Sequence, residues 1–276
     1  MTTDAPARGR AIQWEDVKIP AWLSGTIGGV GLVALWWIIS AIWVSPNGTH
    51  PIPSPPEVIL SYFDSGWDFY WRNFSVTLEE AGIGYVWGNG LALLLSAVVL
   101  IVPRLEGVAM QLAILTYCVP IVAIGFIAVV LFGAPPVGEP SGTAVFLAAL
   151  SVFFTTVVGA LLGLKSADKT SLDLITVYGG SKFTQLIKVR LIAALPAILN
   201  ALQIAVPAAF LGAVLGEFFG KVEAGVGLAM ILAQQNSDAP LVWALALASG
   251  AVALLGFGLV GLIARLVAPW SKGTAS

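Results

Sequence analysis

The sequence predicts an all-α membrane protein with six transmembrane helices. Hydrophobic residues form 58% of the 276-residue chain and charged residues only 10%, and the mean hydropathy is +0.93. A soluble domain has about 25% charged residues, so this chain has too few to cover a water-facing surface. Stretches without Asp, Glu, Lys or Arg are each long enough for the roughly 20 residues that cross a bilayer as a helix. They comprise residues 19–56, 81–103, 107–138, 140–164, 191–216 and 239–264.

Helices are the predicted spanning element because in lipid the backbone must satisfy its own hydrogen bonds. A β-barrel would require alternating segments of about ten residues, and runs such as 91–95 do not alternate. The expected spans are residues 22–44, 78–102, 107–132, 143–164, 191–215 and 240–267.

Shorter segments connect these spans. Pro55 and Glu57 favour a helix start, because proline suits the first turn and an acid suits the N-terminal dipole. We expect this helix to be amphipathic and to lie at the outer interface before the second span. Residues 103–106 form a tight cytoplasmic turn, and Pro120 stands in the middle of the third span. The apolar segment 225–233 is too short to span, so it dips into the outer half of the membrane or packs across helix ends.

The basic residues predict the orientation. With a cytoplasmic N-terminus, Arg72 and Lys221 are the only two of the 13 Lys and Arg residues in outer segments. This bias follows the positive-inside rule, so both termini are expected in the cytoplasm. The predicted organisation is a cytoplasmic tail at 1–18, a transmembrane domain at 19–270 with a cytoplasmic loop at 165–190, and a tail at 271–276.

Several function classes find no support in the sequence. No basic face suits nucleic acid. The single cysteine, Cys118, excludes an internal disulfide and a multi-cysteine metal site. The only histidine, His50, lies in an outer loop without catalytic partners, which disfavours a membrane enzyme. The segment 216–221 has three residues between its glycines and Val222 after its lysine, so it is not a phosphate-binding loop.

The loop 165–190 is the densest charged region of the chain. Ser171 is a suitable N-cap for a short helix that begins near Leu172. The segment 179–181 should end this helix, and a second turn at 182–188 leads into the fifth span. The sequence therefore predicts two short helical pieces, separated by glycines, at the cytoplasmic surface.

Motifs in and after this loop resemble a known family. Asp173 stands where that family has Glu, and Tyr178-Gly179 and Leu195-Pro196-Ala197-Ile198 match its loop and the start of its next span. Glu217 and Gly225-Val226-Gly227-Leu228 match an acid and a turn further on. Together these motifs resemble the permease subunits of ATP-binding-cassette importers. Ile52-Pro53-Ser54-Pro55 and the Ser75…Gly84-Tyr85 pattern narrow the resemblance to the sulfonate, taurine and nitrate branch, over about 52–270.

The sequence also departs from that pattern. Asp173 replaces Glu, Ile175 and Thr176 stand where small residues are usual, and Glu80 stands where this branch often has Arg. A degenerate loop occurs in heterodimers of two permeases and in divergent homodimers, and both alternatives stay open.

The resemblance implies a type I importer permease fold. It also implies a multi-pass protein of the bacterial plasma (inner) membrane. It implies two copies of an ATP-binding subunit, a second permease copy or a homologous permease, an extracytoplasmic solute-binding protein, and membrane lipid around the spans. ATP and Mg would bind the partner ATPase, and no cofactor is expected in this chain. The docking surface for the ATPase would lie at 171–188, with these residues: Ser171, Asp173, Tyr178, Gly179 and Lys182.

Polar residues within spans suggest a solute path. Asn200 and Gln203 are three residues apart and share one face of the fifth span. Such groups are costly in hydrocarbon and tend to face an interior or a cavity. Thr116 and Tyr117 are further candidates, whereas for Asn89 we favour a helix–helix hydrogen bond.

Acids at the outer ends of spans suggest a second site. Glu217 and Glu223 are candidates for an outer gate or for contact with the binding protein, and the alternative for both is a solvated loop charge. A stand-alone secondary transporter or channel is the alternative function. Proton- or sodium-coupled carriers usually place acids within spans, and here the acids lie at span ends. The solute itself is not readable from the sequence.

Overall fold

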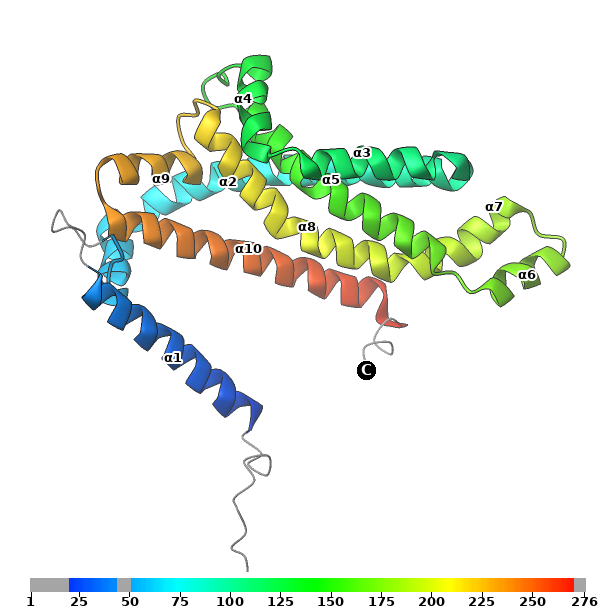
Figure 1. Ribbon diagram of the computed structural model, residues 1–276, viewed down its shortest axis with the longest axis horizontal. Coiled ribbons are helices and arrows are strands. Elements are labelled where there is room, and N and C mark those ends of the chain that lie inside the picture. The colour runs from blue at the N-terminus through cyan, green and yellow to red at the C-terminus, as the bar shows by residue number, and fades with distance from the viewer. Residues whose placement is uncertain (1–19, 44–50, 271–276) are drawn as a thin grey trace, which may run out of the picture. The chain divides into compact units, whose positions relative to one another are not determined.

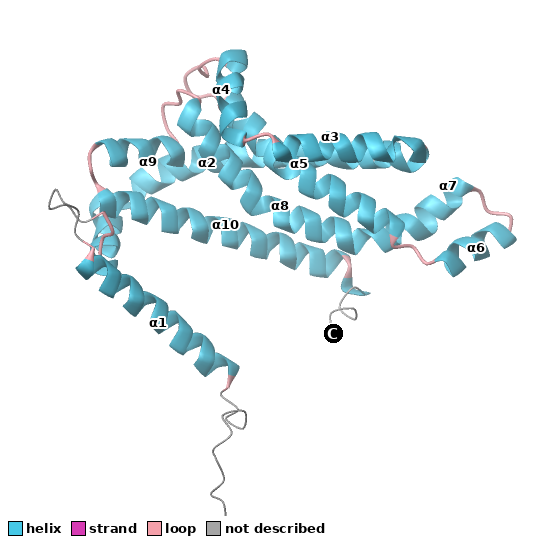
Figure 2. Cartoon of the chain, in the orientation of Figure 1, coloured by secondary structure: helices cyan, strands magenta, loops and turns pink. Residues whose placement is uncertain are grey.

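The computed structural model describes residues 20–43 and 51–270, so the tails predicted at 1–18 and 271–276 lie outside the described residues, and His50 does as well. Regular structure in the described part is helical throughout, without strands (Figure 2). Two compact units are present, Met1–Glu57 and Val58–Ser276. The predicted all-α class is confirmed.

The first unit contains one long helix. Helix α1 spans Ala21–Ile42, close to the predicted first span. The proline-rich segment after it returns along the helix: the Trp36 indole N–H donates to the Pro53 carbonyl (3.0 Å), and the Ser40 hydroxyl donates to the Ile52 carbonyl (2.9 Å). The two carbonyl groups belong to an irregular proline-rich segment and have no partner in a helix. The side chains of α1 supply the hydrogen-bond donors that they need.

Helix α2, Pro55–Ile101, joins two elements that the sequence analysis separated. Its start was predicted: Pro55 opens the helix, and the Ser54 N–H donates to the Glu57 carboxylate (2.6 Å). The predicted interfacial helix then continues into the second span through a kink at Gly66, where φ is +73°. This backbone conformation suits glycine, because a side chain there would be strained. The helix that contains the predicted second span therefore runs without a break from the Gly66 kink to Ile101.

The predicted third span is broken. Helices α3 (Glu106–Cys118) and α4 (Ile121–Phe132) meet at 92°, after the short turn η2 (Pro103–Leu105). Pro120 has no N–H to continue the helix and forces Val119 into extended backbone. The described residues thus include five long apolar helices, or six spans if the broken pair counts as one.

The other elements of the second unit follow in chain order: α5 (Gly142–Lys165), α6 (Lys169–Val177), α7 (Lys182–Gln185), η3 (Leu186–Arg190), α8 (Leu191–Phe219), α9 (Val226–Gln235) and α10 (Ala239–Val267). Helices α6 and α7 lie at one end of α5 and α8, and α9 lies toward the other end (Figure 1).

Helices α5 and α8 form the centre of this unit. Two pairs of glycines, each four residues apart, line their contact: Gly159 and Gly163 on α5, and Gly212 and Gly216 on α8. A Cβ atom at Gly163 would lie 2.9 Å from the Ala194 carbonyl oxygen. Small residues let helices approach closely in lipid, where association depends on van der Waals contact rather than on hydrophobic burial.

Polar bonds connect the neighbouring helices. The Thr156 hydroxyl of α5 donates to the buried Asn89 side chain of α2 (2.5 Å), which confirms the helix–helix bond expected there. The Tyr62 hydroxyl of α2 donates to the Ala244 carbonyl of α10 (2.7 Å), and the Tyr85 hydroxyl donates to the Leu202 carbonyl of α8 (3.0 Å).

Candidate functional site

The cytoplasmic loop begins with a capped helix. The Asp168 carboxylate accepts a bond from the Ser171 N–H (3.1 Å), so α6 begins at Lys169. The prediction that Ser171 itself is the N-cap is wrong. An aspartate three residues earlier satisfies the same backbone donor, and the Ser171 hydroxyl donates to it as well (3.2 Å).

Helix α6 ends at the predicted glycines. Gly179 has φ +76°, and its N–H donates to the Thr176 carbonyl (3.0 Å). The Gly180 N–H donates to the Ile175 carbonyl (2.8 Å). This paired arrangement is the Schellman motif, which requires a left-handed residue and therefore favours glycine. The predicted break is confirmed.

The second piece of the loop holds the first in place. Ser181 caps α7 by accepting a bond from the Thr184 N–H (3.3 Å). The Gln185 side-chain amide then donates to the Leu172 carbonyl (2.9 Å) and to the Thr176 hydroxyl (2.7 Å), both on α6. From Gln185 the chain passes through η3 directly into α8. Helix α6 is therefore bonded to the segment that continues into the central helix α8 through Gln185, a residue that the sequence did not single out.

The loop presents an apolar surface to solvent. Val177 and Tyr178 are both 83% exposed, and Leu174 and Phe183 are also largely exposed. The predicted docking residues Asp173, Gly179 and Lys182 are exposed beside them, whereas Ser171 is half-buried. Large apolar side chains grouped with charged ones at a water-facing end are typical of a protein contact.

A surface ion pair closes the same end of the bundle. The Lys165 ammonium group at the end of α5 lies 2.5 Å from the Glu106 carboxylate at the start of α3. Both residues belong to segments that the positive-inside rule predicts to be cytoplasmic. Their contact in the structure is consistent with both segments lying on the same side of the membrane.

The opposite end holds a cluster of buried side chains around the start of α9. The first backbone N–H groups there, at residues 225–227, donate in order to Asn73 Oδ1 (3.1 Å), Thr77 Oγ1 (2.9 Å) and Glu217 Oε2 (2.5 Å). The Thr77 hydroxyl in turn donates to Glu217 Oε1 (2.5 Å). Residues of α2 and α8 therefore cap α9 in place of a local N-cap.

Glycines allow the Glu217 carboxyl group to reach this helix start. A Cβ atom at Gly225, where φ is +139°, would collide with the carboxyl group, and one at Gly227 would lie 2.9 Å from Glu217 Cβ. The Gly225-Val226-Gly227 motif is therefore needed for the close approach of a carboxylate to backbone N–H groups.

Glu80 lies in the same region. Its Oε1 atom accepts a bond from the Ser141 N–H (2.7 Å), and the Ser141 hydroxyl caps α5 by accepting from the Ala144 N–H (3.4 Å). Glu80 and Glu217 are each 1% exposed. From the sequence, Glu80 stands out only as a departure from the family pattern.

The burial of Glu217 corrects one prediction. A carboxyl group that is 1% exposed is neither a solvated loop charge nor a surface contact for a binding protein. A gate role for Glu217 stays a prediction. Glu223 is exposed and remains available for an outer contact.

Two of the predicted path residues come together. Asn200 and Gln203 line a cavity of about 210 Å³ between α8 and α10, with Arg265 at its wall. The side chain of Gln203 packs directly on Gly261. The shared face predicted for the two residues is confirmed, and their role in a solute path stays a prediction.

The other two predicted path residues lie elsewhere. Tyr117 is 72% exposed and stacks on Phe154 of α5, with ring centroids 4.7 Å apart. The Thr116 hydroxyl donates to the Ala113 carbonyl of its own helix (2.7 Å). Neither lines the cavity of Asn200 and Gln203. Cys118 is exposed where α3 ends.

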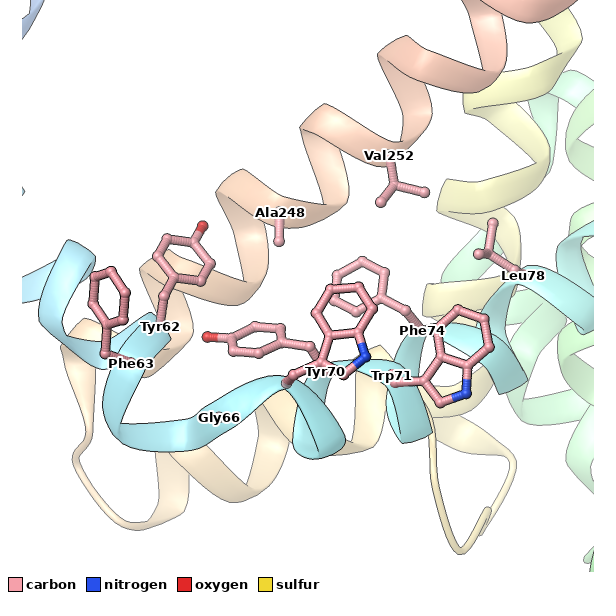
Figure 3. Close-up of a pocket in the computed structure, with 10 residues that line it drawn as sticks. Tyr62, Phe63, Gly66, Tyr70, Trp71, Phe74, Leu78, Ala248 and Val252 are labelled. Carbon is pink, nitrogen blue, oxygen red and sulfur yellow. The ribbon is translucent and has the colours of Figure 1, made fainter.

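A larger pocket of about 650 Å³ lies at the Gly66 kink, between α2 and α10. Figure 3 shows aromatic side chains of α2 lining it opposite Ala248 and Val252. Trp67 and Trp71 stack with centroids 6.2 Å apart. The wall is apolar, so it suits hydrocarbon better than a polar solute.

Comparison with known proteins finds one family and several relatives. Residues 84–270 match the family described as binding-protein-dependent transport system inner membrane component. A probable ABC transporter permease protein of Haemophilus influenzae is 28% identical over 87% of this chain and 94% of its own. The formylaminopyrimidine transport permease protein of Halalkalibacterium halodurans is 26% identical, with 91% and 96% covered. A putative aliphatic sulfonates transport permease protein of Bacillus subtilis is 25% identical, with 90% and 88% covered.

Proposed function

Because the chain belongs to the family of binding-protein-dependent transport system inner membrane components, we propose that it is the permease subunit of an ATP-driven importer. The chain is a multi-pass protein of the bacterial inner membrane, and its relatives are permease proteins, a transport rather than a catalytic role. The solute is a small polar or anionic organic molecule delivered by an extracytoplasmic binding protein. Energy comes from a separate ATPase, which binds ATP and Mg.

The exposed face of α6 is the observation that carries this proposal. Its two most exposed apolar residues, Val177 and Tyr178, lie beside the Gly179 turn, where the backbone leaves room for a partner surface. Asp173 and Lys182 are exposed nearby and supply charge-assisted hydrogen bonds at the rim of the contact. An apolar centre with a charged rim is the usual anatomy of a protein interface.

The internal bonds of the loop support a mechanical role. Coupling requires an element that moves as a unit, and the two bonds from Gln185 make α6 and α7 such an element. Closure of two ATPase subunits on each other would move α6, and η3 carries that movement into α8 without a flexible linker. Asn200 and Gln203 lie further along α8, so the movement reaches the proposed path.

The solute class is supported by the relatives and by the cavity. Two relatives are named for formylaminopyrimidine and aliphatic sulfonates, which are small organic solutes. The Asn200 and Gln203 amides offer hydrogen-bond donors and acceptors, and Arg265 offers a positive charge for an anionic group. A second copy of this chain or a homologous permease completes the path, with Thr116 and Tyr117 as further candidates.

A pair of matched substitutions tests the docking surface. Val177→Asp places a charge in the proposed contact, and Val137→Asp places the same charge at a residue that is 82% exposed, in the turn between α4 and α5. When the ATP-binding subunit is co-expressed, we expect Val177→Asp to lose co-purification and solute-stimulated ATP hydrolysis, and Val137→Asp to retain both.

Equal co-purification of the two variants would contradict the proposed docking surface. Solute uptake driven by an ion gradient without ATP would support the alternative, a stand-alone secondary transporter.

A further inference from the structure

We propose that Glu80 and Glu217 bind one proton between them, in a buried site that stabilises the contact of α9 and α5 with α2 and α8. This inference concerns the outer end of the bundle and does not depend on the ATPase-docking proposal.

The two carboxyl groups are buried against each other. Each residue is 1% exposed, and the Thr77 hydroxyl, on the same face of α2 one turn before Glu80, donates to Glu217. The helices that carry them are held close by their neighbours: a Cβ atom at Gly220 would lie 2.7 Å from the hydroxyl of Ser141, the residue whose N–H binds Glu80. Both carboxyl groups are therefore shielded from bulk solvent.

The two carboxyl groups have four oxygen atoms, and the described residues supply hydrogen-bond donors to three of them. Glu217 accepts from the Thr77 hydroxyl and the Gly227 N–H, and Glu80 Oε1 accepts from the Ser141 N–H. Glu80 Oε2 is buried without a hydrogen-bond partner among the described residues. A buried polar atom without a partner costs about 1–3 kcal/mol, and more when it is charged. A proton on either carboxyl group supplies the missing donor.

The surroundings can support one negative charge but not two. All the donors that face the pair are neutral: Thr77 from α2, Ser141 from α5 and Gly227 from α9. The N-termini of α5 and α9 add partial positive charge. The further charged group that acts on Glu80 is Glu79 on α2, which is itself an acid. Two like charges in contact and out of water are strongly unfavourable, so such pairs share one proton.

The shared proton makes the outer contact sensitive to pH. A glutamate in water loses its proton near pH 4.3, so separation of α9 from α8 would release the shared proton at neutral pH. The packed state binds one proton more than the separated state. A rise in pH therefore shifts the equilibrium from the packed to the separated state. The packed outer end is favoured by acid and weakened by alkali.

Infrared spectroscopy of the purified chain in lipid nanodiscs at neutral pH tests the site directly. We expect a carbonyl stretch of a protonated carboxyl group that resists exchange in heavy water. Glu80→Gln and Glu217→Gln should each remove it, because a single remaining carboxylate no longer needs the proton. Glu79→Gln is the matched control, since Glu79 is adjacent in sequence but exposed, and it should retain the band. A wild-type spectrum without the band, or a band that persists in both variants, would overturn the proposal.

Thermal unfolding supplies an independent measurement. From about pH 5 to pH 9, the wild type should lose stability relative to Glu80→Gln, whose amide donates to Glu217 at every pH. A parallel pH dependence of the two proteins would contradict proton sharing. Recovery of wild-type stability at high pH by sodium or another small cation, together with absence of the infrared band, would identify a cation site and also overturn the proposal.

Discussion

The two ends of the α5–α8 pair are built by different kinds of bond. At the end predicted to be cytoplasmic, the side-chain bonds within residues 168–185 join residues no more than 13 positions apart, such as Gln185 and Leu172. At the outer end, the bonds of Thr77 reach Glu217 and Val226, 140 and 149 positions away. The loop is therefore organised by its own sequence and leaves an apolar face free. The outer cluster exists only when four helices meet, and it buries its polar groups.

The largest expected effect tests the contact on which the outer end depends. In Gly216→Ala, the new Cβ atom would overlap the Ala144 backbone, so α5 and α8 must separate. We expect a loss of about 3 kcal/mol in stability, at the upper end of overpacking costs. The control is Gly90→Ala, a helical glycine with open space around it, where alanine should stabilise by about 0.5 kcal/mol. Thermal unfolding in detergent measures both, and changes of the same sign would contradict the close contact.

A smaller effect is expected inside the outer cluster. Thr77→Val keeps the shape of the side chain but removes the hydroxyl, and it leaves the buried Val226 N–H without an acceptor. The expected loss is about 2 kcal/mol. Ser96→Ala is the matched control, because the Ser96 hydroxyl is also buried on α2 but bonds only the Ala92 carbonyl of its own helix. Equal losses in chemical unfolding would show that the cluster adds nothing beyond local bonding.

The smallest expected effect concerns the loop. Gln185→Ala removes the two bonds between α7 and α6, so α6 should open locally at a cost of about 1 kcal/mol. We expect faster hydrogen exchange of the α6 amides while the global unfolding temperature is unchanged. Gln234→Ala, an exposed glutamine on α9, should leave exchange in α6 at its wild-type rate. A fall in global stability for Gln185→Ala would mean that the loop is part of the core rather than a locally organised element.

The contrast also explains which predictions succeeded. The Gly179 break and the two-piece loop were readable because capping and left-handed turns depend on residues within a few positions. The N-cap was assigned to Ser171 instead of Asp168 because both are good caps and sequence alone does not rank them. The signal for the broken third span was present in Pro120, but its 92° bend depends on what α3 and α4 pack against.

The outer cluster could not be predicted in the same way. Glu80, Ser141 and Glu217 are distant in sequence, and an acid at the end of an apolar stretch looks solvated when its neighbours are unknown. The glycine pairs of α5 and α8 were visible as a four-residue spacing, yet only the packed structure shows that the two pairs face the other helix.

The sequence by itself determined that this chain is a helical membrane protein and predicted that its basic loop is cytoplasmic, because the bilayer acts on hydropathy and charge residue by residue. Tertiary structure alone decided that α2 is kinked at Gly66, that the third span is broken, and that Glu80 and Glu217 are both buried. These outcomes depend on close contacts between helices, and a contact is a property of two distant segments rather than of either one.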